Sequence, residues 1–253
     1  MACHSQLGIV LRQQGFPDEA LWHAEEGIAA ARAASHPLSE AFALVLAAGL
    51  HQARGELTLC LERAEAALAL ATEQMLPFWA AFAMTLSGWA LVKTGQAAKG
   101  LDQLRAGLDA GLAIGHRTKE PDWLALFAEA SLGTGRIEEG LSAVRKGLAE
   151  TEETGARYSE AELNRLEGEL LLASKEPDQK RAEDSFRKAI AVARAQGAKS
   201  SELRAATSLA RLLAHQGKRA EARDLLAPVY GWFTEGFDTA DLKEAKALLD
   251  QWA

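Results

Sequence analysis

The sequence predicts an all-α fold in which helical hairpins stack into a solenoid. Glycine recurs at a strict spacing of forty residues, between apolar-periodic stretches, at Gly15, Gly55, Gly95 and Gly135. A repeat of this length is typical of a solenoid, because each unit buries its apolar face against its neighbours. The periodicity is helical, helix-forming residues dominate, and no long alternating or β-branched run indicates a strand.

The apolar period and the glycines together place the helices. Leu101, Leu104 and Leu108 share one helical face. The recurring glycines and Gly217 fit the position after a helix end, where glycine adopts a left-handed conformation without steric cost. The predicted pairs of first and second helices cover residues 2–14 and 18–34, 38–54 and 57–74, 78–94 and 97–114, 120–133 and 137–154, 158–173 and 179–196, and 199–215 and 219–231. The fifth pair is joined by residues 174–178, a longer turn that lacks glycine.

One further helix, 238–252, is predicted at the end of the chain. Asp238 is a natural N-cap for it, with Asp241 three residues later. Its apolar stripe suits a helix that closes a stack of repeats, and consists of Leu242, Ala245, Leu248, Leu249 and Trp252. We therefore expect a single solenoid domain over 1–253, with repeats at about 1–36, 37–76, 77–117, 118–156, 157–198 and 199–235 before the capping helix.

Composition and charge argue against several functional classes. The formal net charge of -7 argues against binding to nucleic acid or to an anionic membrane surface. The longest apolar run, residues 41–50, is too short to cross a bilayer, and the N-terminal stretch lacks the basic region of a signal peptide. Two cysteines, Cys3 and Cys60, provide no disulfide framework. We expect a cytoplasmic protein without nucleic-acid or membrane partners.

No motif in the sequence supports catalysis or cofactor binding. The string closest to a P-loop, residues 196–200, has no first glycine and no preceding strand. The six histidines never pair at a metal-binding spacing, and no G-x-S-x-G motif exposes a serine nucleophile. We therefore expect a non-enzymatic protein with no cofactor and no metal.

Small and apolar residues occupy equivalent positions in the successive units. In the first and fifth units they are Leu7-Gly8, Leu11, Gly15 and Ala20, and Gly168, Leu171, Ala182, Phe186 and Ala189; the small position after the turn holds Cys60, Gly100 and Gly140 in the middle units. In this pattern the chain resembles the tetratricopeptide-repeat family, which implies a right-handed α-α superhelix. The period of forty exceeds the family's ~34 and implies longer helices. HEAT and armadillo repeats also have periods near forty, but the glycine-terminated hairpins favour the tetratricopeptide interpretation.

The C-terminal stretch 216–252 and the preceding 158–172 carry a second resemblance. They are similar to the repeat region of large bacterial signalling ATPases, in which a class III nucleotide cyclase or a transcription-factor domain precedes a P-loop ATPase. The resemblance covers essentially the whole chain but only that family's repeat region. It implies a sensory or scaffolding module of a bacterial signal-transduction system.

In the tetratricopeptide family the first helix of each pair lines the concave groove, so superposing the six units predicts which side chains face it. The predicted binding residues are Phe82, Trp89, Lys93, Glu129, Glu162, Arg165, Glu169, Arg204 and Arg211, and the wider set adds Arg12, Gln13, Phe42, Val45, Gln52, Asp122 and His215. Aromatic anchors beside mixed charges suit a protein segment or peptide, because the apolar groups supply affinity and the charges fix its register.

Other interpretations of these residues remain open. Phe82 and Trp89 also suit simple space-filling between long helices, and Glu162 and Glu169 lie at spacings that pair them with arginines. A small-molecule sensor is the alternative function, with Trp89, Glu129 and Arg165 lining a metabolite pocket. Trp22, Trp79 and Trp123 are expected to pack between repeats instead.

The first predicted helix is unusually apolar for the free end of a solenoid, with Leu7, Ile9, Val10 and Leu11 in succession apart from Gly8. Terminal repeats normally present a polar outer face. We therefore expect that this chain is the tail of a longer protein, or that this end docks on a partner or on the chain itself.

Overall fold

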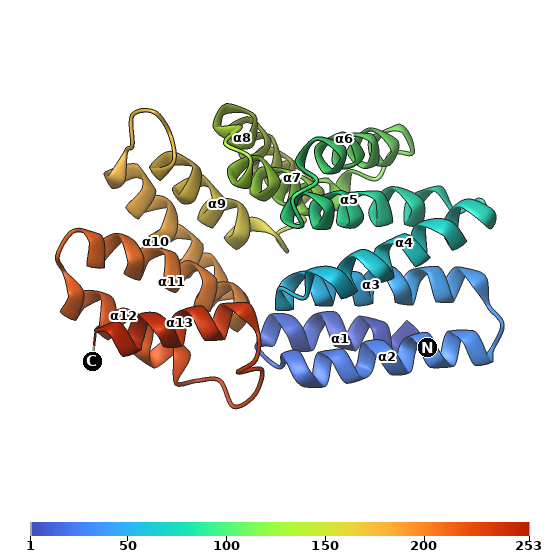
Figure 1. Ribbon diagram of the computed structural model, residues 1–253, viewed down its shortest axis with the longest axis horizontal. Helices are drawn as coiled ribbons and strands as arrows, with labels where there is room; N and C mark the ends of the chain where they lie inside the picture. The colour runs from blue at the N-terminus through green and yellow to red at the C-terminus, as the bar shows by residue number, and fades with distance from the viewer. Residues whose placement is uncertain (1, 253) are drawn as a thin grey trace.

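The computed structural model describes residues 2–252, which contain thirteen α-helices, one 3₁₀ helix and no strand (Figure 1). The helices are α1 (Ala2–Gln14), α2 (Pro17–Ala33), α3 (Pro37–Arg54), α4 (Leu57–Glu73), α5 (Pro77–Lys93), α6 (Ala97–Ala113), η1 (Arg117–Lys119), α7 (Glu120–Gly133), α8 (Ile137–Thr154), α9 (Glu160–Leu172), α10 (Gln179–Gln196), α11 (Lys199–His215), α12 (Arg219–Tyr230) and α13 (Ala240–Gln251). Consecutive helices pack in antiparallel pairs, so the predicted all-α superhelix of hairpins is confirmed.

The predicted turn glycines have the left-handed conformation that the sequence required of them. The φ angles are +97° at Gly15, +77° at Gly55, +90° at Gly95 and +72° at Gly135. Each follows a first helix, so the polypeptide reverses there without steric strain on a side chain. Observed helix ends lie within about two residues of the predicted ones, which is the ordinary uncertainty of helix boundaries.

Two predictions at the level of single residues were wrong. Asp238 does not cap α13, which begins two residues later with Thr239 at the N-cap and no side-chain capping bond. The Asp238 carboxylate instead accepts hydrogen bonds from Arg54 at 3.0 and 3.1 Å. Trp22 does not pack between repeats, because its side chain lies on the outer face with 56% exposed, beside His4 and His23.

The core is a continuous layer of buried side chains between successive helices. Trp123 is fully buried and fills the space left by Gly111 of α6, which confirms the expected packing between repeats. Trp79 of α5 lies against Phe42 of α3, with ring centroids 5.0 Å apart, and has the same role. Helices α5 and α6 approach so closely at Gly88 and Gly100 that an added Cβ at either would meet backbone atoms of the other helix.

The superhelix closes on itself, so that its first and last hairpins touch. Figure 1 shows α1 and α2 beside α11 and α13, and α1 contacts α11 directly. The Ser200 hydroxyl donates to the Arg12 carbonyl at 2.6 Å, and the rings of Phe16 and Trp232 meet edge to face. The Glu235 carboxylate accepts the backbone N–H groups of the first turn of α2, where a helix N-terminus favours an anion.

We call the contact between the first and last hairpins the seam. A cluster of charged groups completes it. Arg54, at the end of α3, donates to Asp18 of α2 at 2.7 Å and to Asp238 before α13. Asp18 also accepts the backbone N–H of Gly236 at 2.9 Å. The N-terminal end therefore docks on the chain itself, which is one of the alternatives predicted for the apolar first helix. The contact is made by the C-terminal end of α1 and its turn, whereas Leu7 and Val10 remain exposed.

Candidate functional site

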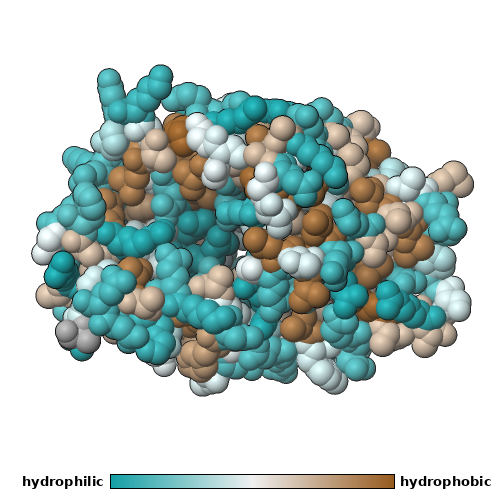
Figure 2. Space-filling model, viewed as in Figure 1, coloured by the Kyte–Doolittle hydropathy of each residue, from teal (hydrophilic) through white to brown (hydrophobic). Residues whose placement is uncertain are grey.

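A central cavity of about 270 Å³ lies inside the closed superhelix. The first helices of all six hairpins contribute to its wall, namely α1, α3, α5, α7, α9 and α11, and α13 joins them. Figure 2 shows the face of the molecule hollowed near its middle, with hydrophobic surface gathered over the side of α3 to α5. Because the ring is closed, the expected concave groove is a central cavity that the inner helices border and that opens at the face seen in Figure 2.

One side of the cavity is apolar and comes from α3 and α5. The rings of Phe42, Phe78, Trp79 and Phe82 form this wall together with aliphatic side chains such as Val45. They pack on one another, since Phe78 and Phe82 lie in edge-to-face contact and Trp79 touches Phe42. Such a wall offers a rigid apolar surface to a ligand.

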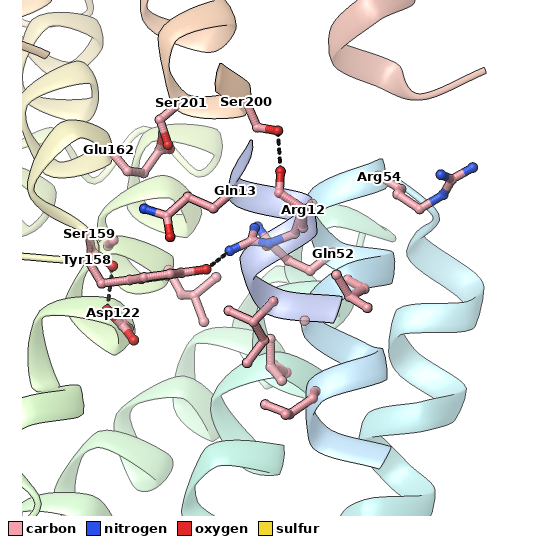
Figure 3. A pocket seen from close by; sticks show the side chains of 18 of the residues that line it. Arg12, Gln13, Gln52, Arg54, Asp122, Tyr158, Ser159, Glu162, Ser200 and Ser201 are labelled. Carbon is pink, nitrogen blue, oxygen red and sulfur yellow. Dashed lines mark hydrogen bonds between the residues drawn. The ribbon is translucent and has the colours of Figure 1, made fainter. Parts of the chain in front are cut away.

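The opposite side is polar and comes from α7, α9 and α11. Asp122 accepts a hydrogen bond from the Ser159 hydroxyl and forms an ion pair with Lys119 at 3.1 Å. Glu162 and Ser201 lie nearby and also line the cavity (Figure 3). This side of the cavity therefore presents both hydrogen-bond donors and hydrogen-bond acceptors.

Arg12 of α1 reaches across the cavity to the polar side. Its guanidinium donates to the hydroxyl of Tyr158, which precedes α9, and lies 5.8 Å from the centre of that ring. Figure 3 shows this bridge, with Gln13 and Gln52 beside it. Within residues 2–252, Arg12 forms no ion pair, and neither glutamine amide has a hydrogen-bond partner.

An ion-pair network begins at the cavity wall and runs outward. Arg204 of α11 lies 3.3 Å from Glu162 and 3.8 Å from both Glu129 and Asp241. Glu129 also pairs with Lys93 at 3.0 Å and accepts a hydrogen bond from the Trp89 indole at 2.9 Å. Burial opposes ionisation of Glu129, but the positive charges of Arg204 and Lys93 outweigh it and lower the pKa of this carboxyl to about 2.

The same network continues along α9 to α13. Arg165 lies 2.6 Å from Glu162 and 3.5 Å from Glu169, and Glu169 lies 2.6 Å from Arg211. Arg211 ends the series in an ion pair with Glu244 at 3.0 Å. Alternating charges on five helices thus satisfy one another. Arg204 and Arg211, which were predicted to face the groove, already have carboxylate partners.

At its inner end the network leaves one carboxyl poorly compensated. Burial raises the pKa of Asp241 above its ordinary value, and the positive charges of Arg204, 3.8 Å away, and of Arg165 do not outweigh it. Asp241 lines the cavity.

The nine predicted binding residues divide into two groups. Phe82, Glu129, Glu162 and Arg204 line the cavity. The others are outside its lining, with Trp89 only 3% exposed, and the charged ones form the ion-pair network; they are Trp89, Lys93, Arg165, Glu169 and Arg211. Of the wider set, all but His215 line the cavity: Arg12, Gln13, Phe42, Val45, Gln52 and Asp122.

Sequence reasoning missed several residues of the cavity. Tyr158 was placed at the start of a helix, yet it lies in the turn before α9 and points toward Arg12. Ser201, Phe233 and Asp241 enter the cavity only because the ring closes. The repeat pattern carries no signal for these residues, because closure joins segments that no periodicity relates.

The described part of the chain contains no cluster of three or more metal-ligating side chains. Two histidines that are not at a metal-binding spacing in the sequence nevertheless lie in contact. The Nδ1 atom of His4 in α1 is 2.8 Å from that of His23 in α2. Between residues 2 and 252, no helix combines the length and hydropathy needed to span a membrane.

Comparison with known proteins gives relatives in structure rather than in sequence. No protein-family model matches the chain, and no curated protein matches it significantly. The apo form of RapI superimposes with a TM-score of 0.66 over 98% of this chain and 83% of its own length, at 13% identity. A Rap protein in complex with Competence and Sporulation Factor gives a TM-score of 0.67, at 14% identity over 98% of this chain and 72% of its own.

A third similar structure is a Signal Transduction ATPase with Numerous Domains that has a tetratricopeptide repeat sensor, from Pyrococcus horikoshii. It gives a TM-score of 0.54 at 14% identity, over 98% of this chain but only 42% of its own length. At such identities, structural similarity shows the fold alone. The chain therefore has the fold of tetratricopeptide-repeat proteins, an α-α superhelix of helical hairpins.

Proposed function

We propose that this chain is a non-enzymatic, protein-binding repeat module that holds a short segment of a protein or peptide in its central cavity. The observation that carries the proposal is the cavity wall itself. All six hairpins contribute to it, with aromatic rings on one side and hydrogen-bonding groups on the other. Rings anchor apolar side chains, and the polar side pairs with a peptide backbone and fixes its register.

The structural relatives support this assignment of ligand class. One of them is a Rap protein in complex with Competence and Sporulation Factor, and another has a tetratricopeptide repeat sensor attached to a signal-transduction ATPase. By analogy, we place this chain in the cytoplasm of a bacterium, as the sensory region of a signalling ATPase or nucleotide cyclase system.

The closed ring suggests how binding is transmitted. A ligand in the cavity touches the first hairpin and the last ones at once, because Arg12 and Arg204 both line it. Binding then stabilises the closed ring relative to an opened one, by an amount set by the difference in affinity for the two states. An associated domain that contacts the outer face senses the change in superhelical shape.

The test is selection of ligands from a library of displayed short peptides, followed by titration calorimetry with the full chain. We expect Phe82→Ala to weaken the selected peptides by about tenfold or more, because Phe82 presents its ring to the cavity. Trp22→Ala removes an aromatic ring from the outer face and is expected to leave affinity unchanged. Peptides that bind both variants as well as wild type, or no selected peptide at all, contradict the proposal.

A small metabolite is the second candidate ligand, and the small volume of the cavity favours it. A cavity of about 270 Å³ lies near the lower end of the range for small-molecule pockets, ~300–1,000 Å³. The two ligand classes differ in the number of hairpins that they contact. Affinity for a peptide is expected to depend on residues from three or more hairpins, such as Arg12, Phe82 and Glu162, whereas a metabolite depends on fewer.

A further inference from the structure

The cavity contains one basic residue whose charge no described residue neutralises. Four basic residues line it, and three of them have carboxylate partners: Arg54 pairs with Asp18 and Asp238, Lys119 with Asp122, and Arg204 with Glu162. Arg12 is the exception within residues 2–252, since its guanidinium donates only to the neutral hydroxyl of Tyr158. A half-buried cation without a counter-charge is costly to keep unless a ligand supplies one.

The groups around Arg12 can all donate hydrogen bonds toward the same space. The Tyr158 hydroxyl accepts from Arg12, which leaves its own proton free for an acceptor in the cavity. The side-chain amides of Gln13 and Gln52, also without partners among the described residues, lie beside it (Figure 3). Lys119 lies 5.5 Å from the centre of the Tyr158 ring, but Asp122 neutralises its charge. We call Arg12, Gln13, Gln52 and Tyr158 the donor cluster.

The position of the guanidinium is fixed before any ligand binds. The Tyr158 hydroxyl accepts a hydrogen bond from the end of the side chain, and the Arg12 carbonyl accepts one from Ser200. Arg54, by contrast, points away from the cluster toward the seam (Figure 3). A pre-oriented arginine loses little conformational entropy on binding and presents a fork that matches a planar oxyanion.

We propose that the donor cluster binds a carboxylate of the cavity's ligand. The inference rests on the proposed function for the location of the site, and it adds the chemistry of the group that is recognised. A singly charged carboxylate fits better than a phosphate dianion, because Asp122 and Glu162 line the same cavity and repel a second negative charge. The aromatic rings of Phe42 and Phe82 line the same cavity and suit an apolar group of the same ligand.

The test compares probes that differ only in this group. They are the tripeptide acetyl-Ala-Ala-Phe with a free C-terminal carboxylate, the same tripeptide amidated, and amidated acetyl-Asp-Ala-Phe, whose carboxylate is on a side chain. Each is titrated into the full chain by calorimetry, with inorganic phosphate as a separate oxyanion probe. We expect at least one carboxylate probe to bind about tenfold more tightly than the neutral tripeptide. The better carboxylate probe identifies whether a chain terminus or an acidic side chain is read.

Arg12→Met is expected to abolish the preference for the carboxylate, so that the acid probe and its amidated counterpart bind this variant with equal affinity. The backbone contact with Ser200 survives this substitution, and circular dichroism verifies folding. Arg223→Met removes an exposed arginine of α12 and serves as the matched control, with unchanged affinity. Tyr158→Phe deletes one donor only, and we expect it to reduce carboxylate affinity several-fold, which keeps the proposal testable if Arg12→Met fails to fold.

The outcomes separate this inference from the proposed function. Equal binding of acid and amide probes, both lost in Phe82→Ala, overturns carboxylate recognition while peptide binding in the cavity stands. Carboxylate binding that neither Arg12→Met nor Phe82→Ala weakens lies outside the cavity and contradicts both. Phosphate binding that is tighter than that of every carboxylate probe, and lost in Arg12→Met, overturns the choice of a singly charged group. No binding by any of the probes also overturns the inference.

Discussion

Glycines at helix contacts show how single residues set the spacing between hairpin partners. A Cβ added to Gly100 of α6 would lie 2.6 Å from the Gly88 carbonyl oxygen and 2.6 Å from the Val92 nitrogen, both backbone atoms. Gly49, in the middle of α3, faces open space, and nothing lies within 4 Å of its added Cβ. The two glycines therefore separate the steric effect of a methyl group from its effect on helix propensity.

We expect Gly100→Ala to lower the free energy of unfolding by about 1–3 kcal/mol, because the backbones of α5 and α6 must separate. Gly49→Ala is expected to raise it by about 0.5–1 kcal/mol, since alanine has the higher helix propensity. Urea denaturation of both variants measures this. Destabilisation of equal size in the two variants would refute the steric explanation.

Glu129 shows how an ion-pair network makes stability depend on pH. The pKa of its carboxyl is about 2 in the folded chain, against an ordinary value of 4.5. A folded-state pKa below the unfolded one stabilises the protein above the unfolded value, and this stabilisation is lost as the pH falls toward the folded value. The window for Glu129 therefore runs from about pH 4.5 down to about pH 2.

Glu129→Gln removes this pH-dependent contribution, because the amide does not titrate. We expect wild type to exceed the variant in unfolding free energy at pH 5, and the difference to narrow by about 2 kcal/mol at pH 3. Urea denaturation at the two pH values measures the difference. A gap between wild type and Glu129→Gln that stays constant with pH would show that the Glu129 charge is not responsible.

At the scale of elements, the ends of α10 and α13 show why similar sequence signals have different outcomes. Asp178 accepts a hydrogen bond from the Arg181 backbone N–H at 2.9 Å and caps α10. Asp238 also precedes a helix, α13, yet its carboxylate accepts hydrogen bonds from Arg54 and does not cap the helix. Asp238 forms a tertiary ion pair with Arg54, whereas Asp178 forms no ion pair within residues 2–252 and its carboxylate accepts the helix N–H group.

Asp178→Ala is expected to lower the free energy of unfolding by about 1 kcal/mol, since the first turn of α10 loses its cap. Asp178→Asn retains an acceptor and is expected to preserve most of the stability. Thermal and urea denaturation compare the two. An asparagine variant that is as unstable as the alanine variant would indicate a charge effect in place of capping.

At the scale of the whole molecule, the seam determines whether the superhelix is a ring. Arg54 has a side chain only 5% exposed, and it lies among the carboxylates of Asp18, Glu56 and Asp238. Removing its charge leaves three negative groups close together at the contact between the first and last hairpins. Such a change acts on closure, because α2 and the segment before α13 then repel each other.

We expect Arg54→Met to open the ring, which increases the radius of gyration measured by small-angle X-ray scattering while helix content is retained. Arg105→Met breaks an exposed ion pair with Glu139, away from the seam, and is the matched control. An unchanged radius of gyration in a folded Arg54→Met would mean that Phe16, Trp232 and Glu235 suffice for closure.

The sequence by itself determined the helices and their turns, and its resemblance to tetratricopeptide repeats implied that each first helix faces inward. These are local properties: the turn glycines, the apolar period and the forty-residue repeat each act within one hairpin and its neighbours. They placed Phe82, Glu129, Glu162 and Arg204 at the cavity, because position within a repeat decides which face of a helix is inward.

Only the tertiary structure decided that the superhelix closes and which polar side chains remain available to a ligand in the cavity. Closure depends on small rotations summed over six hairpins, and it joins Arg54 to Asp238, which are 184 residues apart. Trp89 is withdrawn from the binding surface because its indole donates to Glu129 of the next repeat, a contact that a superposition of single repeats does not contain. Arg165 instead pairs within its own helix, with Glu162 and Glu169, at the spacings that the sequence had offered. Arg12 was recognisable as inward-facing, but its lack of a counter-charge follows from Tyr158 lying across the ring, since long-range geometry decides which partners a charged side chain meets.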